Sequence, residues 1–171
     1  MIVVKKTQNM ANAKTIDYQD SYSANLPTKE PSLTIEEVGR GFFSTAPSWL
    51  KKLFMLRNKL VKFIGLKVGK EAEDREAMLA AYNFEVGEAF GLFKVFQKSD
   101  NALIIGADDK HLDFRVSLLI DRSATEKEKL TITTTVYFHN WTGRLYFIPV
   151  KPFHSLAVPA MLRSIVKKLK K

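Results

Sequence analysis

The sequence predicts an α+β fold in which one curved antiparallel sheet wraps around a long C-terminal helix. Three observations support this prediction. Between Thr34 and Ile64, apolar residues recur at three- and four-residue steps, as they do in amphipathic helices. From Glu85 to His139 they recur at every second residue, and short polar turns separate the runs, as in consecutive strands. After Trp141 the helical spacing returns.

The composition is that of one globular domain. The chain has 171 residues, of which 46% are apolar and 26% are charged, and this is enough to build one core. We expect residues 1–14 to be a flexible leader and residues 15–169 to be a single folded domain. The chain lacks cysteine, which excludes disulfides and thiol chemistry. It also lacks an apolar run of about 18 residues or a signal-peptide pattern, so a cytoplasmic location is expected.

The elements that precede the sheet can be assigned in order. Residues 16–24 alternate apolar and polar side chains and are expected to form a first strand. Thr34 and Glu37 have the spacing of a capping box, which predicts a short helix. Residues 47–66 are predicted to form a longer amphipathic helix, and residues 71–81 an acidic, partly helical linker.

Four strands are predicted over residues 90–97, 102–107, 112–121 and 130–139, joined as consecutive hairpins. The third strand places five apolar side chains on one face, namely Leu112, Phe114, Val116, Leu118 and Ile120. Its other face carries polar residues, and the fourth strand alternates in the same way. The sheet is therefore predicted to be covered on one face only.

The last helical segment contains Pro149, Pro152 and Pro159. An internal proline removes a hydrogen bond and clashes with the carbonyl four residues back. We therefore expect a short helix over residues 144–148 and a main helix over residues 153–169, bent at Pro159. Helical spacing predicts which residues of the main helix face the sheet: Phe153, Leu156, Ala157, Ala160, Met161, Ser164 and Ile165.

Three segments of the chain resemble the signatures of a known family. They are Ala46-Pro47-Ser48-Trp49-Leu50 with its continuation to Leu66, then Asp109 to Val116, and Gly143-Arg144-x-Tyr146 with its continuation to His154. This pattern resembles an uncharacterised bacterial family of unknown function within the START/SRPBCC (polyketide cyclase-like, helix-grip) superfamily, over about Asp17 to Lys167.

The resemblance implies a helix-grip fold, in which the sheet holds the C-terminal helix and often encloses a cavity, and it implies no established activity. In some relatives the domain follows a nicotinamide-binding, reductase-like domain. This sequence has no Gly-x-Gly-x-x-Gly turn, so we expect no such domain here.

One cluster of side chains has the composition of a metal site. His111 lies among Asp108, Asp109 and Asp113, and such a set could ligate a divalent cation. Aspartates at a hairpin turn more often bond their own backbone and stay solvated. The sequence therefore predicts no metal and no cofactor.

Two further residues could bind or react. Arg115 shares a strand face with Asp113 and is expected to form an ion pair, with an anionic ligand as the alternative. His154 is expected to bond a neighbouring group, because no nucleophile motif accompanies it. No catalytic residue is predicted.

The net charge of +9 comes from two basic segments. Residues 51–70 contain seven bases and residues 163–171 contain five, and neither segment contains an acid. Solvated helix faces account for such runs, and an anionic membrane surface is the alternative. The bases expected to contact a membrane or anion are Lys51, Lys52, Lys59, Lys62, Lys167 and Lys168. Nucleic acid is disfavoured, because no aromatic residues are interleaved with these lysines on a sheet surface.

The cavity that the resemblance implies suggests a function. We expect the chain to bind a small apolar or amphipathic molecule between the sheet and the C-terminal helix. The residues expected to line this site are Phe93, Phe114, Val116, Leu118, Val136, Phe153, His154, Ala157 and Met161. Two alternatives stay open, a cyclase- or isomerase-type enzyme that uses the same cavity and an interaction domain with a filled core. The sequence does not decide whether a reaction is catalysed.

Overall fold

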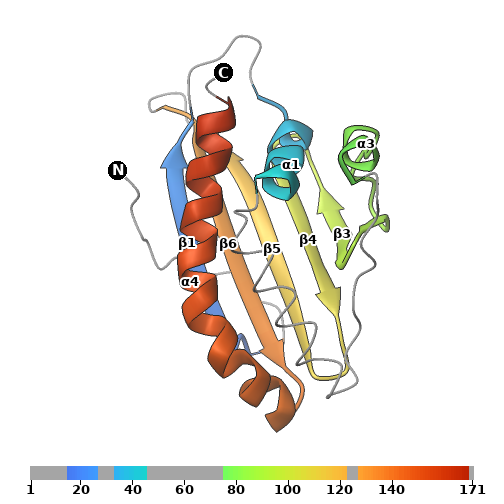
Figure 1. Cartoon of the computed structure of the whole chain (residues 1–171), viewed down its shortest axis with the longest axis vertical. Helices are drawn as coiled ribbons and strands as arrows, with labels where there is room; N and C mark the ends of the chain where they lie inside the picture. The colour runs from blue at the N-terminus through green and yellow to red at the C-terminus, as the bar shows by residue number, and fades with distance from the viewer. Residues whose placement is uncertain (1–14, 27–32, 46–74, 123–126, 170–171) are drawn as a thin grey trace.

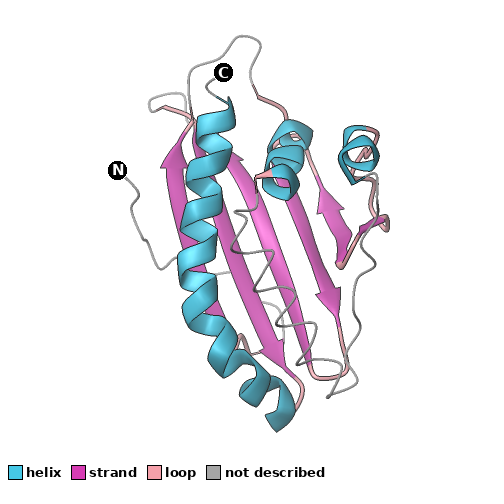
Figure 2. Ribbon diagram, viewed as in Figure 1, coloured by secondary structure: helices cyan, strands magenta, loops and turns pink. Residues whose placement is uncertain are grey.

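The computed structural model describes residues 15–26, 33–45, 75–122 and 127–169. In these residues a six-stranded antiparallel sheet packs against a helix of 29 residues, α4 (Trp141–Leu169) (Figures 1 and 2). Across the sheet the strands follow the order β1 (Tyr18–Asn25), β6 (Lys129–Phe138), β5 (Leu112–Asp121), β4 (Ala102–Asp108), β3 (Phe93–Lys98) and β2 (Ala89–Phe90). The predicted α+β fold, with a sheet around a long C-terminal helix, is confirmed.

The strand pairing brings distant parts of the chain together. β3 to β6 are antiparallel neighbours in chain order, which confirms the predicted hairpins. β1 forms the edge of the sheet next to β6, and their register sets Asp20 opposite Thr134. Residues near the start of the chain therefore lie beside the last strand and beneath α4 (Figure 1).

The two faces of the sheet differ as the alternation predicts. On the inner face, Val116, Leu118 and Ile120 of β5 are buried, and Phe114 is half-buried. On the outer face, hydroxyl groups pair across strands, with 2.9 Å between Ser21 Oγ and Thr133 Oγ1. Helices α4 and α1 (Ile35–Ser44) lie side by side on the inner face (Figure 1), so the described helices cover one face.

Arg115 lies on the outer face, where its guanidinium group has two partners. Its Nη2 lies 2.6 Å from Asp108 Oδ1, and its Cζ lies 3.5 Å from the centre of the Phe96 ring. The predicted ion pair is confirmed. Because a carboxylate and an aromatic ring already hold the charge, nothing at this position points to an anionic ligand.

Helix α1 begins as the capping box predicts. The backbone amide of Glu37 donates to Thr34 Oγ1 at 3.2 Å, and the amide of Thr34 donates to Glu37 Oε2 at 2.9 Å. The helix then buries Phe42 and Phe43 in an aromatic group against the sheet. Helix α3 (Arg75–Ala80) falls within the segment predicted to be partly helical, whereas the predicted helix over residues 47–66 lies outside the described residues.

The predicted break in the last helix is wrong. α4 runs without interruption from Trp141 to Leu169 with all three prolines inside it. Each proline lacks the amide that would bond the carbonyl four residues back, and those carbonyls belong to Leu145, Ile148 and Ser155. All three of these residues are exposed, so water can hydrogen-bond the carbonyls while the helix curves along the sheet (Figure 1).

The start of α4 is fixed by a capping residue, a close backbone approach and an ion pair. Asn140 caps the helix, because its Oδ1 accepts a hydrogen bond from the Gly143 amide at 3.1 Å. A side chain at Gly143 would collide with the carbonyl oxygen of His111, so only glycine allows this close approach. Arg144 then pairs with Asp17 beside β1 at 2.8 Å. Trp141 and Thr142 therefore form the first turn of α4.

The predicted inner face of α4 is also wrong in part. Ala157, Met161 and Ile165 are buried against the sheet as expected, but Val158 and Leu162 are buried with them. Phe153 is 45% exposed, and Leu156 points to solvent as well. The helix carries apolar residues on two faces, so the apolar spacing alone does not define which face is buried.

Candidate functional site

Polar side chains interrupt the core between the sheet and α4. A large apolar cluster includes Val116, Ile132 and Met161, and a small one consists of Leu112, Val136 and Phe147 with partly buried neighbours. On three elements, the residue between the two clusters is polar, Asp20 on β1, Thr134 on β6 and His154 on α4. We call these three residues and Tyr18 the polar layer.

The carboxylate of Asp20 is the centre of the polar layer. Its Oδ2 accepts hydrogen bonds from the Tyr18 hydroxyl at 2.8 Å and from His154 Nδ1 at 3.0 Å. Its Oδ1 is buried and has no hydrogen-bond partner in the described part of the chain. The side chain as a whole is only 13% exposed, so water reaches it poorly.

Thr134 stands opposite Asp20 on the neighbouring strand and is 3% exposed. Its hydroxyl oxygen also lacks a hydrogen-bond partner among the residues that the structure describes. More than nine in ten buried polar groups in proteins are hydrogen-bonded, and leaving one unbonded costs about 1–3 kcal/mol. Two such oxygens on facing positions of one pair of strands mark a place where a further polar group would be stabilised.

The histidine of the layer is oriented by its aspartate. An ionised carboxylate only accepts hydrogen bonds, so Nδ1 of His154 carries the proton that it shares with Asp20. In the neutral ring, Nε2 then has a free lone pair. Within the described residues Nε2 has no hydrogen-bond partner, and it can act as an acceptor or a base.

The tyrosines beside Asp20 stay protonated. Burial raises the pKa of Tyr18 well above its usual value, and the hydrogen bond to Asp20 and the negative charge of Asp20 raise it further. Burial raises the pKa of Tyr22 as well, and so do the charge of Asp20 and a hydrogen-bond interaction with its carboxylate. Tyr18 is therefore a hydrogen-bond donor at physiological pH.

The comparison with known families covers this site. A family model described as "Protein of unknown function (DUF2867)" matches residues 12–161. The chain belongs to the DUF2867 family. This match confirms the predicted membership of a family of unknown function, and it spans all four residues of the polar layer. No curated protein and no solved structure matches the chain.

The residues predicted to line a ligand site fall into several groups in this DUF2867 domain. Four of them, Val116, Leu118, Ala157 and Met161, lie in the large cluster, and Phe93 and Phe114 pack against it. Val136 lies in the small cluster. His154 belongs to the polar layer, and its predicted bond to a neighbouring group is confirmed by Asp20. Phe153 is exposed on α4 and lies outside both clusters.

Asp20 and Thr134 are not among the predicted site residues, although the sequence contains a signal for both. Asp20 has the same parity as Tyr18 and Tyr22 on the first strand, and Thr134 stands between Ile132 and Val136 on the last. A polar residue in an inward-facing position of an alternating strand indicates either a buried bond or a site.

The predicted basic contacts are only partly described. Lys167 is exposed near the end of α4, whereas Lys168 donates a hydrogen bond from Nζ to Ser44 Oγ at 2.9 Å. Lys51, Lys52, Lys59 and Lys62 lie outside the described residues. No helix in the described part of the chain is long and apolar enough to cross a membrane.

The acidic turn around His111 forms separate pairs. Asp108 pairs with Arg115, Asp113 Oδ2 lies 2.9 Å from His139 Nε2, and His111 Nδ1 lies 3.3 Å from Asn140 Oδ1. Among the described residues, no group of three His, Asp or Glu side chains is arranged to hold a metal ion. His111, Asp108 and Asp113 thus take part in fixing the sheet and the start of α4.

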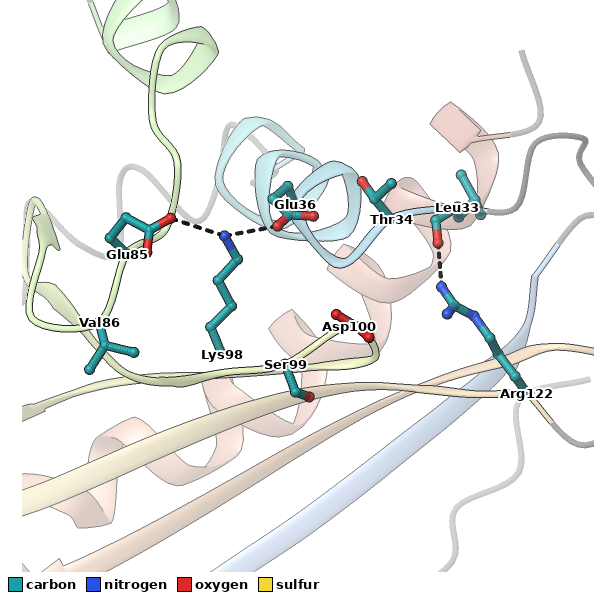
Figure 3. Close-up of a pocket in the computed structure, with 9 residues that line it drawn as sticks. All are labelled: Leu33, Thr34, Glu36, Glu85, Val86, Lys98, Ser99, Asp100 and Arg122. Carbon is teal, nitrogen blue, oxygen red and sulfur yellow. Dashed lines mark hydrogen bonds and ion pairs between the residues drawn. The ribbon is translucent and has the colours of Figure 1, made fainter.

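A hollow of about 600 Å³ lies elsewhere, between α1 and the β3–β4 turn (Figure 3). Lys98 extends between Glu36 and Glu85, at 2.9 Å and 3.3 Å, and Arg122 bonds the Leu33 carbonyl oxygen at 2.7 Å. Burial opposes the ionisation of Glu36, but hydrogen bonds from Lys98, from the backbone and from Thr34, together with the positive charge of Lys98, outweigh it and lower the pKa of Glu36. Neighbouring groups already bond both Lys98 and Arg122. The polar layer, which has unbonded buried oxygens, is therefore the better candidate for a ligand site.

Proposed function

We propose that the chain is a binding module for a small amphipathic molecule whose polar end bonds the polar layer. The observation that carries this proposal is the pair of buried oxygens, Asp20 Oδ1 and Thr134 Oγ1, that lack partners in the described residues. A ligand that supplied hydrogen bonds to both oxygens would remove the cost of leaving them unbonded. Its apolar part would lie against the large cluster, to which α4 contributes Ala157 and Met161.

The chemistry of the layer favours one class of head group. A carboxylate oxygen only accepts hydrogen bonds, so Asp20 Oδ1 requires a donor such as a hydroxyl or an amine. A ligand carboxylate would be repelled by Asp20 in a site of low dielectric constant. The Thr134 hydroxyl can both donate and accept, and suits either kind of head group.

We also assign the chain to the START/SRPBCC superfamily as part of this proposal. A sheet that packs along one long C-terminal helix is the arrangement that the sequence resemblance implies. A ligand site between that helix and the sheet would be in keeping with this arrangement. Fold alone does not establish a ligand, so the proposal depends on the polar layer.

A second candidate function is an enzyme of cyclase or isomerase type. The pairing of Asp20 with His154 Nδ1 favours it, because this orientation leaves Nε2 available to move a proton. A histidine base would act on an acidic C–H or O–H of the bound molecule. A variant His154→Gln should then retain the ligand and lose any reaction.

The experiment that tests the binding proposal is native mass spectrometry of the protein purified from its own cells. We expect a bound small molecule on the unchanged protein, and a much lower occupancy for Thr134→Val. Thr133→Val is the matched control, since Thr133 is the next residue on the same strand and bonds Ser21 on the outer face. Absence of a bound molecule from the unchanged protein, or equal occupancy in Thr134→Val, would overturn the proposal and favour an interaction domain with a filled core.

A further inference from the structure

Helix α4 exposes a continuous apolar stripe on the face that points away from the sheet. The outer stripe consists of Trp141, Leu145, Ile148, Pro152 and Leu156, which follow one another at steps of three and four residues. The four large side chains among them are between 55% and 72% exposed. Phe153 lies at the edge of the stripe and is exposed too.

The fold does not account for this stripe. The opposite face of α4 already supplies the residues that pack on the sheet, including Phe147, Ala157 and Met161. At a rise of about 1.5 Å per residue the outer stripe is about 22 Å long. Single exposed apolar residues are common on protein surfaces, but an aligned series of this length is typical of an interaction site.

The charged residues of α4 itself all have one sign. From Lys129 to the end of the chain the sequence contains no Asp or Glu. Arg144 and Lys151 are exposed on one flank of the stripe, and Arg163 and Lys167 are exposed further along the helix. Asp17 pairs with Arg144, whose side chain nevertheless remains 65% exposed.

We propose that α4 docks along the surface of an anionic lipid bilayer through the outer stripe. Trp141, Ile148 and Leu156 would enter the interfacial region, as in helices that lie in the plane of a membrane. The flanking bases would remain at the level of the lipid phosphates, because long basic side chains can extend to the head groups. The polar layer on the other face of the same helix would then lie one helix diameter, roughly 10 Å, from the lipid.

Charge distinguishes a bilayer from a second copy of the chain. Two copies that met through their outer stripes would bring two uniformly basic helices together, and like charges in contact are destabilising. An anionic bilayer instead supplies the opposite charge along the full length of the helix.

Vesicle binding of the full chain tests the proposal. The sequence contains two tryptophans, Trp49 and Trp141. The test uses a Trp49→Phe background, so that Trp141 is the one tryptophan that remains. Vesicles of phosphatidylcholine mixed with phosphatidylglycerol should sediment the protein and shift the Trp141 emission to shorter wavelength, and pure phosphatidylcholine vesicles should do so far less. Raising the salt concentration should weaken binding.

Two variants separate the apolar and electrostatic parts. Ile148→Ser combined with Leu156→Ser should weaken binding about tenfold or more, because two interfacial anchors are lost. Lys151→Gln combined with Arg163→Gln should weaken it about fivefold per base removed. The matched control is Val86→Ser combined with Leu119→Ser, which replaces two exposed apolar residues outside α4 and should leave binding unchanged.

Three results would overturn the proposal. One is the absence of binding to the anionic vesicles, and another is binding that persists in the Ile148→Ser and Leu156→Ser variant. The third is a concentration-dependent dimer that this variant abolishes, because that result would assign the outer stripe to a second copy. Circular dichroism of each variant distinguishes loss of binding from loss of folding.

Discussion

Thr134→Val exchanges a hydroxyl for a methyl group of nearly the same shape in the centre of the polar layer. The Thr134 side chain is buried and its hydroxyl lacks a partner in the described residues, so the free protein carries the cost of an unbonded polar group. That cost is about 1–3 kcal/mol. Both residues are β-branched and suit a strand equally well. We therefore expect the variant to gain about 1 kcal/mol in free energy of unfolding.

The same exchange at the next position should have the opposite effect. Thr133 bonds Ser21 at 2.9 Å on the outer face, and Ser21 is itself buried. Thr133→Val leaves the Ser21 hydroxyl without its partner, which should lower the free energy of unfolding by about 1 kcal/mol. The two variants thus share their chemistry and strand and differ in the sign of the effect.

Urea unfolding followed by circular dichroism measures both variants. An unchanged slope with a shifted midpoint would show that only stability has changed. In thermal unfolding, 1 kcal/mol corresponds to about 2–4 °C for a chain of this size. A loss of stability in Thr134→Val as large as that in Thr133→Val would refute the reasoning, because it would show that the Thr134 hydroxyl is bonded in the free protein.

Three further predictions concern the fold. Gly143→Ala should lower the thermal midpoint by several degrees, since the added methyl group meets the His111 carbonyl, and a midpoint equal to that of the unchanged protein would contradict the packing described for α4. Phe114→Ala should cost about 3 kcal/mol in urea unfolding, because this half-buried ring contacts both apolar clusters, and a cost near zero would show that the faces of β5 are reversed. Burial raises the pKa of Tyr82 to about 12 from its usual value near 10, so the unfolded chain loses this proton first. The contribution of Tyr82 to the free energy of unfolding should therefore be fully present below pH 10 and be lost as the pH rises from about 10 to 12. Urea midpoints across this range should fall less steeply in Tyr82→Phe.

The strands could be predicted from the sequence because their signals are local. Each strand of the meander alternates between an apolar and a polar face, and each turn follows within a few residues. The capping box at Thr34 is likewise defined by residues three positions apart. The structure confirms these features because burial on one face of the sheet acts in the same direction as the local pattern.

The course of α4 could not be predicted in the same way. Its prolines argue locally for breaks, but the carbonyls that they leave unbonded belong to exposed residues and can bond water. Its apolar residues occupy two faces, so the face that packs on the sheet is decided by the neighbours of α4. The capping bond of Asn140 and the close approach at Gly143 contribute to fixing where the helix begins.

The candidate site depends on a pairing between distant segments. His154 was singled out from the sequence, but Asp20, which orients it, lies 134 residues earlier. Only the pairing of β1 with β6 places that carboxylate beside Thr134 and beneath α4. Asp20 lies two residues from both Tyr18 and Tyr22 in its strand and shares their face, which indicates that its side chain points inward. The pairing of the strands decides which residues it contacts.

The central claim is that the polar layer binds the head group of an amphipathic molecule, and a series of head groups on one chain tests it most directly. We would measure the thermal midpoint of the protein with octanol, octylamine and octanoate. We expect octanol and octylamine to raise the midpoint, because each donates a hydrogen bond to Asp20 Oδ1, and octanoate to raise it least. The increase should vanish in Thr134→Val and persist in Thr133→Val. A midpoint that no member of the series changes, or one that octanoate raises most, would contradict the account.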